Sequence, residues 1–120
     1  IRMEELRALR LIQLLDGLRE ELGLDYAMAN TLEITNGRLT GAVTGELVNK
    51  EVKAKYLRLW AADNQLPLEK TIAIGDGAND LGMMSIAGTS IAFCAKPVVR
   101  EAADVVIDDR DLSKVIELLP

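Results

Sequence analysis

The stretch Thr71–Met84, TIAIGDGANDLGMM, constrains this chain more than any other. It begins with a short apolar and β-branched run, Thr71–Ile74, which predicts a buried strand. Glycines flank Asp76 directly after this run and Asp80 follows four residues later, a pattern that predicts a turn and the start of a helix. In an open α/β sheet, ligands gather beyond the carboxyl ends of the strands, and a carboxylate between glycines at that point suits a hard cation such as Mg²⁺.

A simpler interpretation of the same turn stays open. Glycines and acidic residues are common in turns after a strand, and Asn79 or Asp80 could simply cap the next helix. On that interpretation the turn shapes the backbone and binds nothing. Asp80 nevertheless lies one helical turn beyond Asp76, so the two carboxylates could face the same point.

Composition excludes several classes of function. A chain of 120 residues forms one modest core, and a net charge of −5 argues against nucleic acid as a partner, because phosphate contacts need clustered Lys and Arg. With no histidine in the sequence, His-based catalytic triads and His-ligated zinc are excluded. The single Cys94 cannot form an internal disulfide, which favours a reducing, cytoplasmic location, and no apolar run is long enough to span a membrane.

The first part of the chain predicts a helix and a hairpin. Residues 1–23 carry leucines at helical spacing and predict an amphipathic packing helix, and residues 25–30 predict a short strand. The pair Asn36-Gly37 between two alternating runs predicts a β-hairpin over residues 31–44 that projects from the main sheet.

From Asn49 onward, helices and strands are expected to alternate. Asn49 caps a predicted helix that continues to Asn64. On this helix we expect inward side chains at Val52, Tyr56, Leu59 and Trp60, and more exposed ones at Lys50, Lys53, Lys55 and Arg58. The other predicted strands are 71–74, 89–93 and 105–107, and the other predicted helices are 79–87, 98–103 and 111–118. This alternation predicts an α/β fold with a parallel, Rossmann-like sheet.

Together with the acidic turn, the segments LDYAMANTLEI and IAFCAKPVVREAAD resemble the C-terminal half of the phosphoserine phosphatases, which belong to the haloacid dehalogenase superfamily. The resemblance extends from Leu24 to about Leu119. It implies a HAD-like, three-layer α/β/α fold, incomplete here, with residues 1–120 forming a single partial core. It also implies Mg²⁺-dependent hydrolysis of a small phosphomonoester, O-phosphoserine, through an aspartyl-phosphate intermediate.

The resemblance also implies roles for individual residues. Asp76 would bind Mg²⁺, Lys53 would contact the transferring phosphoryl oxygens, and Asp80 would hold Lys53 in place. Asn79 and Gly77 would contact the substrate. By the same resemblance, a glutamate at the position of Glu4 would hold the amino group of the substrate.

For other residues, plainer interpretations compete with functional ones. From its sequence alone, Lys53 could be an ordinary solvated helix lysine, and only the family spacing to Asp76 favours a role at the site. Lys96 has a family counterpart, but an ordinary loop lysine is the better interpretation. Cys94 is expected to be a small apolar filler rather than a reactive thiol.

Two parts that the family requires do not occur in these 120 residues. The attacking aspartate belongs to an Asp-x-Asp-Ser-Thr string, which is absent, and Ala8 stands where the phosphate-binding serine is expected. The reaction needs a carboxylate to attack phosphorus. We therefore expect a trimmed or spliced version of a longer polypeptide, inactive alone, in which the 71–74 strand is an open apolar edge that could pair two chains into a homodimer. The alternatives are a catalytically inactive module that binds metal, phosphate or a protein, and a structural fragment without a ligand.

Overall fold

The computed structural model describes residues 17–28, 31–44 and 47–119. The chain divides into two compact units, residues 1–48 and 49–120. Most of the predicted N-terminal helix and Glu4 lie outside the described residues. The expectation of a single partial core over residues 1–120 stays a prediction.

In the first unit, a helix over residues 17–22 ends at Gly23, as predicted. Gly23 adopts a φ of 68°, and the Leu24 amide donates a hydrogen bond of 2.9 Å to the carbonyl oxygen of Arg19, which is typical of a glycine helix terminus. The strand predicted over 25–30 is wrong for residues 25–28, which lie in no strand. This segment, Asp-Tyr-Ala-Met, has a single residue with high β propensity.

The predicted hairpin is confirmed. Strand β1 (Thr31–Thr35) pairs antiparallel with β2 (Arg38–Thr44), and the two form a separate two-stranded sheet. Asn36 and Gly37 adopt φ values of 53° and 76°. Positive φ at both central positions is what a tight hairpin turn requires, and Asn-Gly meets that requirement at low cost.

The second unit contains the predicted parallel sheet, with the strand order β3-β4-β5. Strand β3 covers Ile72–Gly75, β4 covers Thr89–Phe93 and β5 covers Val105–Ile107. The predicted bounds hold for β4 and β5, and β3 lies one residue later than expected. Among the described residues no strand pairs with the free side of β3, as predicted for an edge.

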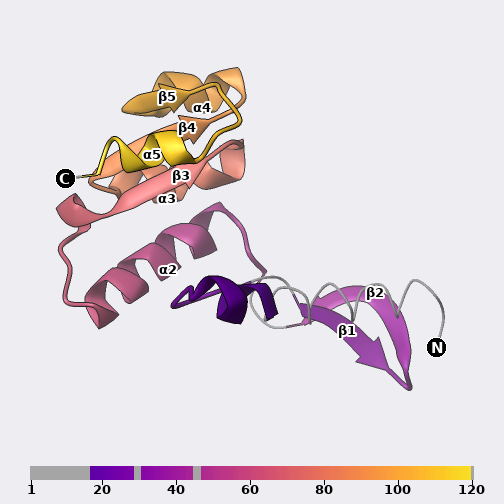
Figure 1. The fold of residues 1–120 in the computed structure, drawn as a ribbon. Coiled ribbons are helices and arrows are strands. Elements are labelled where there is room, and N and C mark those ends of the chain that lie inside the picture. The colour runs from indigo at the N-terminus through magenta and orange to yellow at the C-terminus, as the bar shows by residue number, and fades with distance from the viewer. Residues whose placement is uncertain (1–16, 29–30, 45–46, 120) are drawn as a thin grey trace. The chain divides into compact units, whose positions relative to one another are not determined.

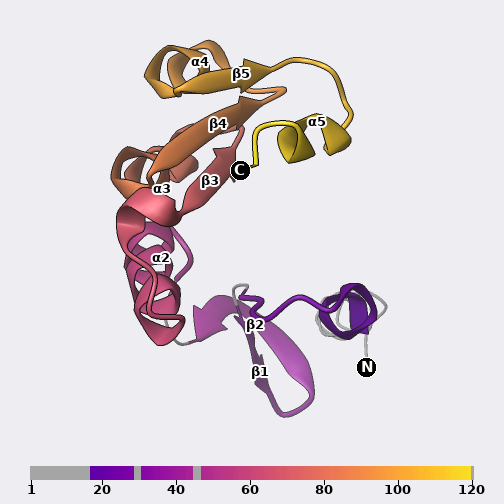
Figure 2. The ribbon, with the colours of Figure 1, turned by 60° about the vertical axis from the view of Figure 1, so that its left-hand side comes forward.

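Four helices accompany this sheet (Figure 1). They are α2 (Lys50–Asp63), α3 (Leu81–Ile86), α4 (Pro97–Ala102) and α5 (Ser113–Ile116), and short 3-10 turns cover η1 (Leu68–Lys70) and η2 (Ala78–Asp80). Helices α3 and α4 lie on one face of the sheet and α5 lies on the other (Figure 2). The helix predicted over 79–87 consists of η2 followed by α3. The final helix, α5, is shorter than the predicted 111–118.

The core lies between the sheet and the α3–α4 layer. Its buried residues are Ala73, Met84, Ala92 and Val99. Two of these are alanines on the strands, which lets the helices approach the sheet closely. On the opposite face Ile91 and Ile107 are buried, whereas Ile74 on the edge strand β3 remains 39% exposed.

Helix α2 begins as predicted, because the Asn49 side chain accepts a hydrogen bond of 2.9 Å from the Val52 amide. The prediction of an inward Leu59 is wrong, since this residue is 46% exposed. The buried residues of α2 are smaller: Val52, Ala54 and Ala61. Small residues suit its close approach to α3, where a Cβ at Gly82 would lie 2.9 Å from the carbonyl oxygen of Lys50. Within the described ranges, no helix combines the length and apolar character needed to cross a bilayer.

Candidate functional site

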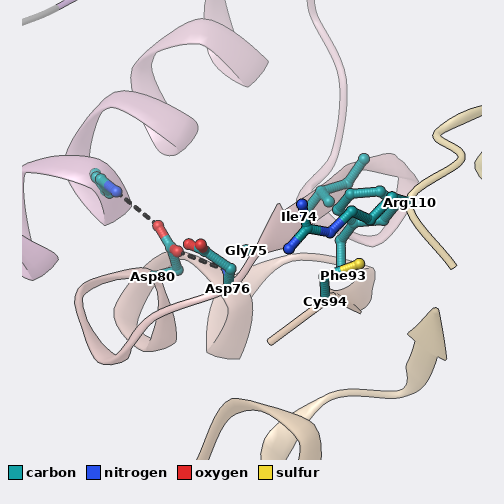
Figure 3. Close-up of a pocket in the computed structure, with 8 residues that line it drawn as sticks. Ile74, Gly75, Asp76, Asp80, Phe93, Cys94 and Arg110 are labelled. Atoms are coloured by element: carbon teal, nitrogen blue, oxygen red, sulfur yellow. Dashed lines mark hydrogen bonds and ion pairs between the residues drawn. The ribbon is translucent and has the colours of Figure 1, made fainter. Parts of the chain in front are cut away.

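The second unit contains a pocket of about 590 Å³ at the carboxyl end of β3 (Figure 3). Parallel strands bring their carboxyl ends to one edge of a sheet, and the turns after β3 and β4 therefore both reach this pocket. Helix α2 and the segment after β5 supply the remaining side chains. The lining residues are Lys53, Ile74, Gly75, Asp76, Asp80, Phe93, Cys94 and Arg110.

Asp80 is buried, and both of its carboxylate oxygens have partners. Oδ1 accepts a hydrogen bond of 2.6 Å from Lys53 Nζ, and Oδ2 accepts from the amides of Asp76 and Gly77 at 3.0 and 3.2 Å. Burial raises the pKa of Asp80, but Lys53 and the two amides outweigh it and hold that pKa below its ordinary value. Asp80 is thus an ionised side chain that fixes the turn and the lysine together.

Gly75 makes room for this arrangement. A Cβ at Gly75 would lie 2.4 Å from Cβ and 2.8 Å from Cγ of Asp80. No side chain fits at such a distance, so glycine is required because the aspartate crosses directly over the backbone. The first glycine of the motif therefore serves the buried carboxylate.

Asp76 shares the turn with Asp80 but is exposed. Its amide donates to Asp80, and its carbonyl oxygen accepts a hydrogen bond of 3.0 Å from the Lys96 amide, which joins the turns after β3 and β4. Its carboxylate has no hydrogen-bond or ion-pair partner among the described residues. The backbone of Asp76 is held firmly while its carboxylate remains available.

The available carboxylate fits a partial Mg²⁺ site. Mg²⁺ in proteins is bound through one or two carboxylates and keeps several waters. Asp76 can supply one such ligand, whereas both oxygens of Asp80 are already engaged. No group of three or more His, Cys, Asp or Glu that could hold a metal occurs in the described part of the chain, so further oxygen ligands would have to come from water, substrate or other residues.

Lys53 lies 27 positions before Asp80 in the sequence, and folding brings the two into direct contact. Its side chain is 28% exposed, and its contact with Asp80 argues against the simpler interpretation as an ordinary solvated helix lysine. The ammonium group has three N–H donors, and the bond to Asp80 uses one of them. The other two donors make no hydrogen bond to any residue that the structure describes.

The other predicted substrate residues are not part of the pocket lining. Asn79 is exposed and lies in η2, and the amide of Gly77 is used by Asp80. Their roles, and that of Glu4 outside the described residues, stay predictions. Cys94 is exposed, has a φ of 45° and donates from Sγ to the Asp108 carbonyl oxygen at 3.3 Å, so its expected role as an apolar filler is wrong.

Sequence reasoning missed Arg110 as a pocket residue. Arg110 lies three residues beyond β5, in the run Asp108-Asp109-Arg110-Asp111. Its place after a third parallel strand was a usable signal, because all three strands end at the same edge of the sheet.

Comparison with known proteins shows the family to which the chain belongs. A haloacid dehalogenase-like hydrolase family model matches residues 15–119. Phosphoserine phosphatases from Streptomyces coelicolor and Streptococcus thermophilus are each 57% identical to the chain, over 107 and 104 residues. The matches cover 89% and 87% of this chain but 26% and 48% of those proteins.

Solved structures give the same result. A phosphoserine phosphatase in its apo form matches with a TM-score of 0.82 and 45% identity, covering 88% of this chain and 52% of that one. A substrate-bound phosphoserine phosphatase complex matches with a TM-score of 0.82 and 44% identity. The chain thus spans between a quarter and about half of the length of these relatives. It belongs to the haloacid dehalogenase-like hydrolase family, and within that family it is similar to part of the phosphoserine phosphatases.

Proposed function

We propose that this chain provides the metal-binding and lysine-bearing part of a Mg²⁺-dependent phosphomonoester hydrolase that acts on O-phosphoserine. One observation carries the proposal: the Lys53–Asp80 ion pair of 2.6 Å lies in the same pocket as the available carboxylate of Asp76. The names of the relatives support the substrate, since each is a phosphoserine phosphatase and one was solved with substrate bound.

In this proposal each charged residue has a separate task. Asp76 holds Mg²⁺, which when bound offsets the charge on phosphate oxygens. Lys53 directs its remaining N–H donors at the phosphoryl group, where positive charge stabilises the negative charge of the transition state. Asp80 orients Lys53 through their ion pair, while Asn79 and Gly77 supply contacts to the substrate.

The attacking carboxylate has no candidate in the family's Asp-x-Asp-Ser-Thr form among the 120 residues. Metal and lysine stabilise charge, but they do not supply the nucleophile that forms an aspartyl-phosphate. We therefore expect the 120-residue chain to bind ligand without turnover, and we expect turnover from a polypeptide that includes the attacking aspartate. The free side of β3 gives a route to homodimers, and a cytoplasmic location is part of the same proposal.

A catalytically inactive binding module is the second candidate, and the absent string favours it for the 120 residues taken alone. Both candidates predict binding of a phosphate compound. They differ in turnover once the attacking aspartate is supplied within a longer polypeptide.

Two assays on O-phosphoserine in the presence of Mg²⁺ test the proposal. Calorimetry on the 120-residue chain should detect binding, and binding should be lost with Asp76→Asn and with Lys53→Gln. Phosphate release should be detectable from a polypeptide extended to include the attacking aspartate, and Asp76→Asn should abolish it. Binding without any release from the extended protein would favour the inactive module, and no binding in either form would contradict both candidates.

A further inference from the structure

Arg110 is a charged side chain of the pocket that the proposed mechanism leaves without a task. It lines the pocket together with Ile74 and Phe93, and in Figure 3 it lies on the other side of Asp76 from Asp80. Its guanidinium makes no hydrogen bond or ion pair with any residue that the structure describes.

The absence of a partner is informative because three aspartates lie close to Arg110 in the sequence. Asp108 pairs with Arg100, and Asp109 pairs with Lys114. Asp111 accepts hydrogen bonds of 3.0 and 2.5 Å from the amide and hydroxyl of Ser113, a separate use of its carboxylate. Each neighbouring carboxylate is engaged elsewhere, and Arg110 is left to face the pocket.

The charges in the pocket indicate what Arg110 would bind. The Asp80 carboxylate is balanced by Lys53, so Asp76 and Arg110 are the two charged side chains of the pocket without a partner in the described part of the chain. A cation at Asp76 would leave the pocket positive. A guanidinium is always charged, and its planar fork matches the paired oxygens of a phosphate or a carboxylate.

We propose that Arg110 is a specificity-determining residue that binds an oxyanion of the ligand in this pocket, either its phosphate or its carboxylate group. The inference rests on the proposed function for the class of ligand. It adds a contact from the segment after β5 to a site otherwise built from α2 and the turn after β3.

Calorimetric titration with two probes, inorganic phosphate and O-phosphoserine, tests this inference with Mg²⁺ present. The proteins are the 120-residue chain, Arg110→Gln, Arg110→Lys and the control Arg58→Gln, which changes an exposed arginine of α2 outside the pocket. Arg110→Gln should weaken binding of O-phosphoserine by about tenfold or more, because a hydrogen bond to a charged group is lost. Arg110→Lys should lose less, since its charge remains, and Arg58→Gln should bind as the wild type does.

The two probes identify the group that Arg110 contacts. Weaker binding of both probes by Arg110→Gln assigns the contact to phosphate, and weaker binding of O-phosphoserine alone assigns it to the carboxylate. Wild-type binding of both probes by Arg110→Gln overturns the inference. If Lys53→Gln still weakens binding in that case, the proposed function survives and only the role of Arg110 fails. If the wild-type chain binds neither probe, both fail.

Discussion

The turn after β3 holds two aspartates four residues apart, in opposite surroundings. Asp80 is 5% exposed, and its oxygens are engaged by Lys53 and two backbone amides, whereas Asp76 is exposed and its carboxylate has no partner among the described residues. The structure therefore distinguishes the two aspartates, although their positions in the sequence give no sign of the difference. The buried carboxylate builds the site, and the open one is available for its chemistry.

Among the variants of this turn, Gly75→Ala should lower the free energy of unfolding the most. Its new Cβ would lie 2.4 Å from Cβ of Asp80, and the buried carboxylate would have to leave its position. We expect the free energy of unfolding to fall by about 3 kcal/mol, measured by urea denaturation. Ala78→Ser, at an exposed position of the same turn, should change little. A loss below about 1 kcal/mol for Gly75→Ala would show that the turn tolerates displacement of Asp80.

Asp80→Ala should cost about 2 kcal/mol, because three hydrogen bonds to an ionised group disappear and Lys53 loses its partner. The partial exposure of Lys53, 28%, lets water replace some of that interaction and keeps the loss moderate. Asp80→Asn should lose less, because an amide oxygen can still accept from the backbone. Urea unfolding of both variants measures this order, and the reverse order would contradict it.

Acid should weaken the ion pair and hydrogen bonds that the Asp80 carboxylate makes. The pKa of Asp80 is lowered in the folded chain, so its ionised form favours folding above the ordinary value of 3.8, and this stability is lost as the pH falls through the lower folded value. The pKa values of Asp104 and Asp111 are also lowered, through hydrogen bonds from Ser90 and Ser113, and they act in the same direction. We expect urea stability to fall below about pH 4, and to fall less steeply in Asp80→Asn. If stability falls equally steeply with pH in the wild type and in Asp80→Asn, Asp80 does not contribute to the acid sensitivity.

Asp76→Asn should have the smallest effect on stability. The Asp76 carboxylate makes no bond to a described residue, so the free energy of unfolding should stay within about 0.5 kcal/mol of wild type in metal-free buffer. A decrease in the free energy of unfolding as large as that expected for Asp80→Ala would mean that Asp76 also has a structural role, and the contrast between the two aspartates would fail.

The acidic motif predicts much of the site, because strand, turn and helix signals coincide within fourteen residues, Thr71–Met84. The bounds of β4 and β5, the hairpin and the Asn49 cap follow from local chemistry and are confirmed. The contact between Lys53 and Asp80 was expected only from the family resemblance, since local patterns do not report a contact across 27 positions.

Other features depend on tertiary contacts. Leu59 has the helical spacing of an inward residue, yet α2 packs through its smaller residues and leaves Leu59 exposed. Arg110 sits among aspartates and looks like part of a solvated charge run. Its availability appears only when Arg100, Lys114 and Ser113 are seen to engage those aspartates.

The most direct test of the central claim is a thermal-unfolding series of wild type and Asp76→Asn across a Mg²⁺ titration. Binding to the folded chain stabilises it by RT ln(1 + L/Kd), where L is the free Mg²⁺ concentration, so Tm keeps rising as Mg²⁺ is added. We predict equal Tm values without Mg²⁺, a rise with Mg²⁺ for the wild type, and no rise for Asp76→Asn. Equal rises in both proteins, or no rise in either, would contradict the claim that the open carboxylate of this turn holds the metal.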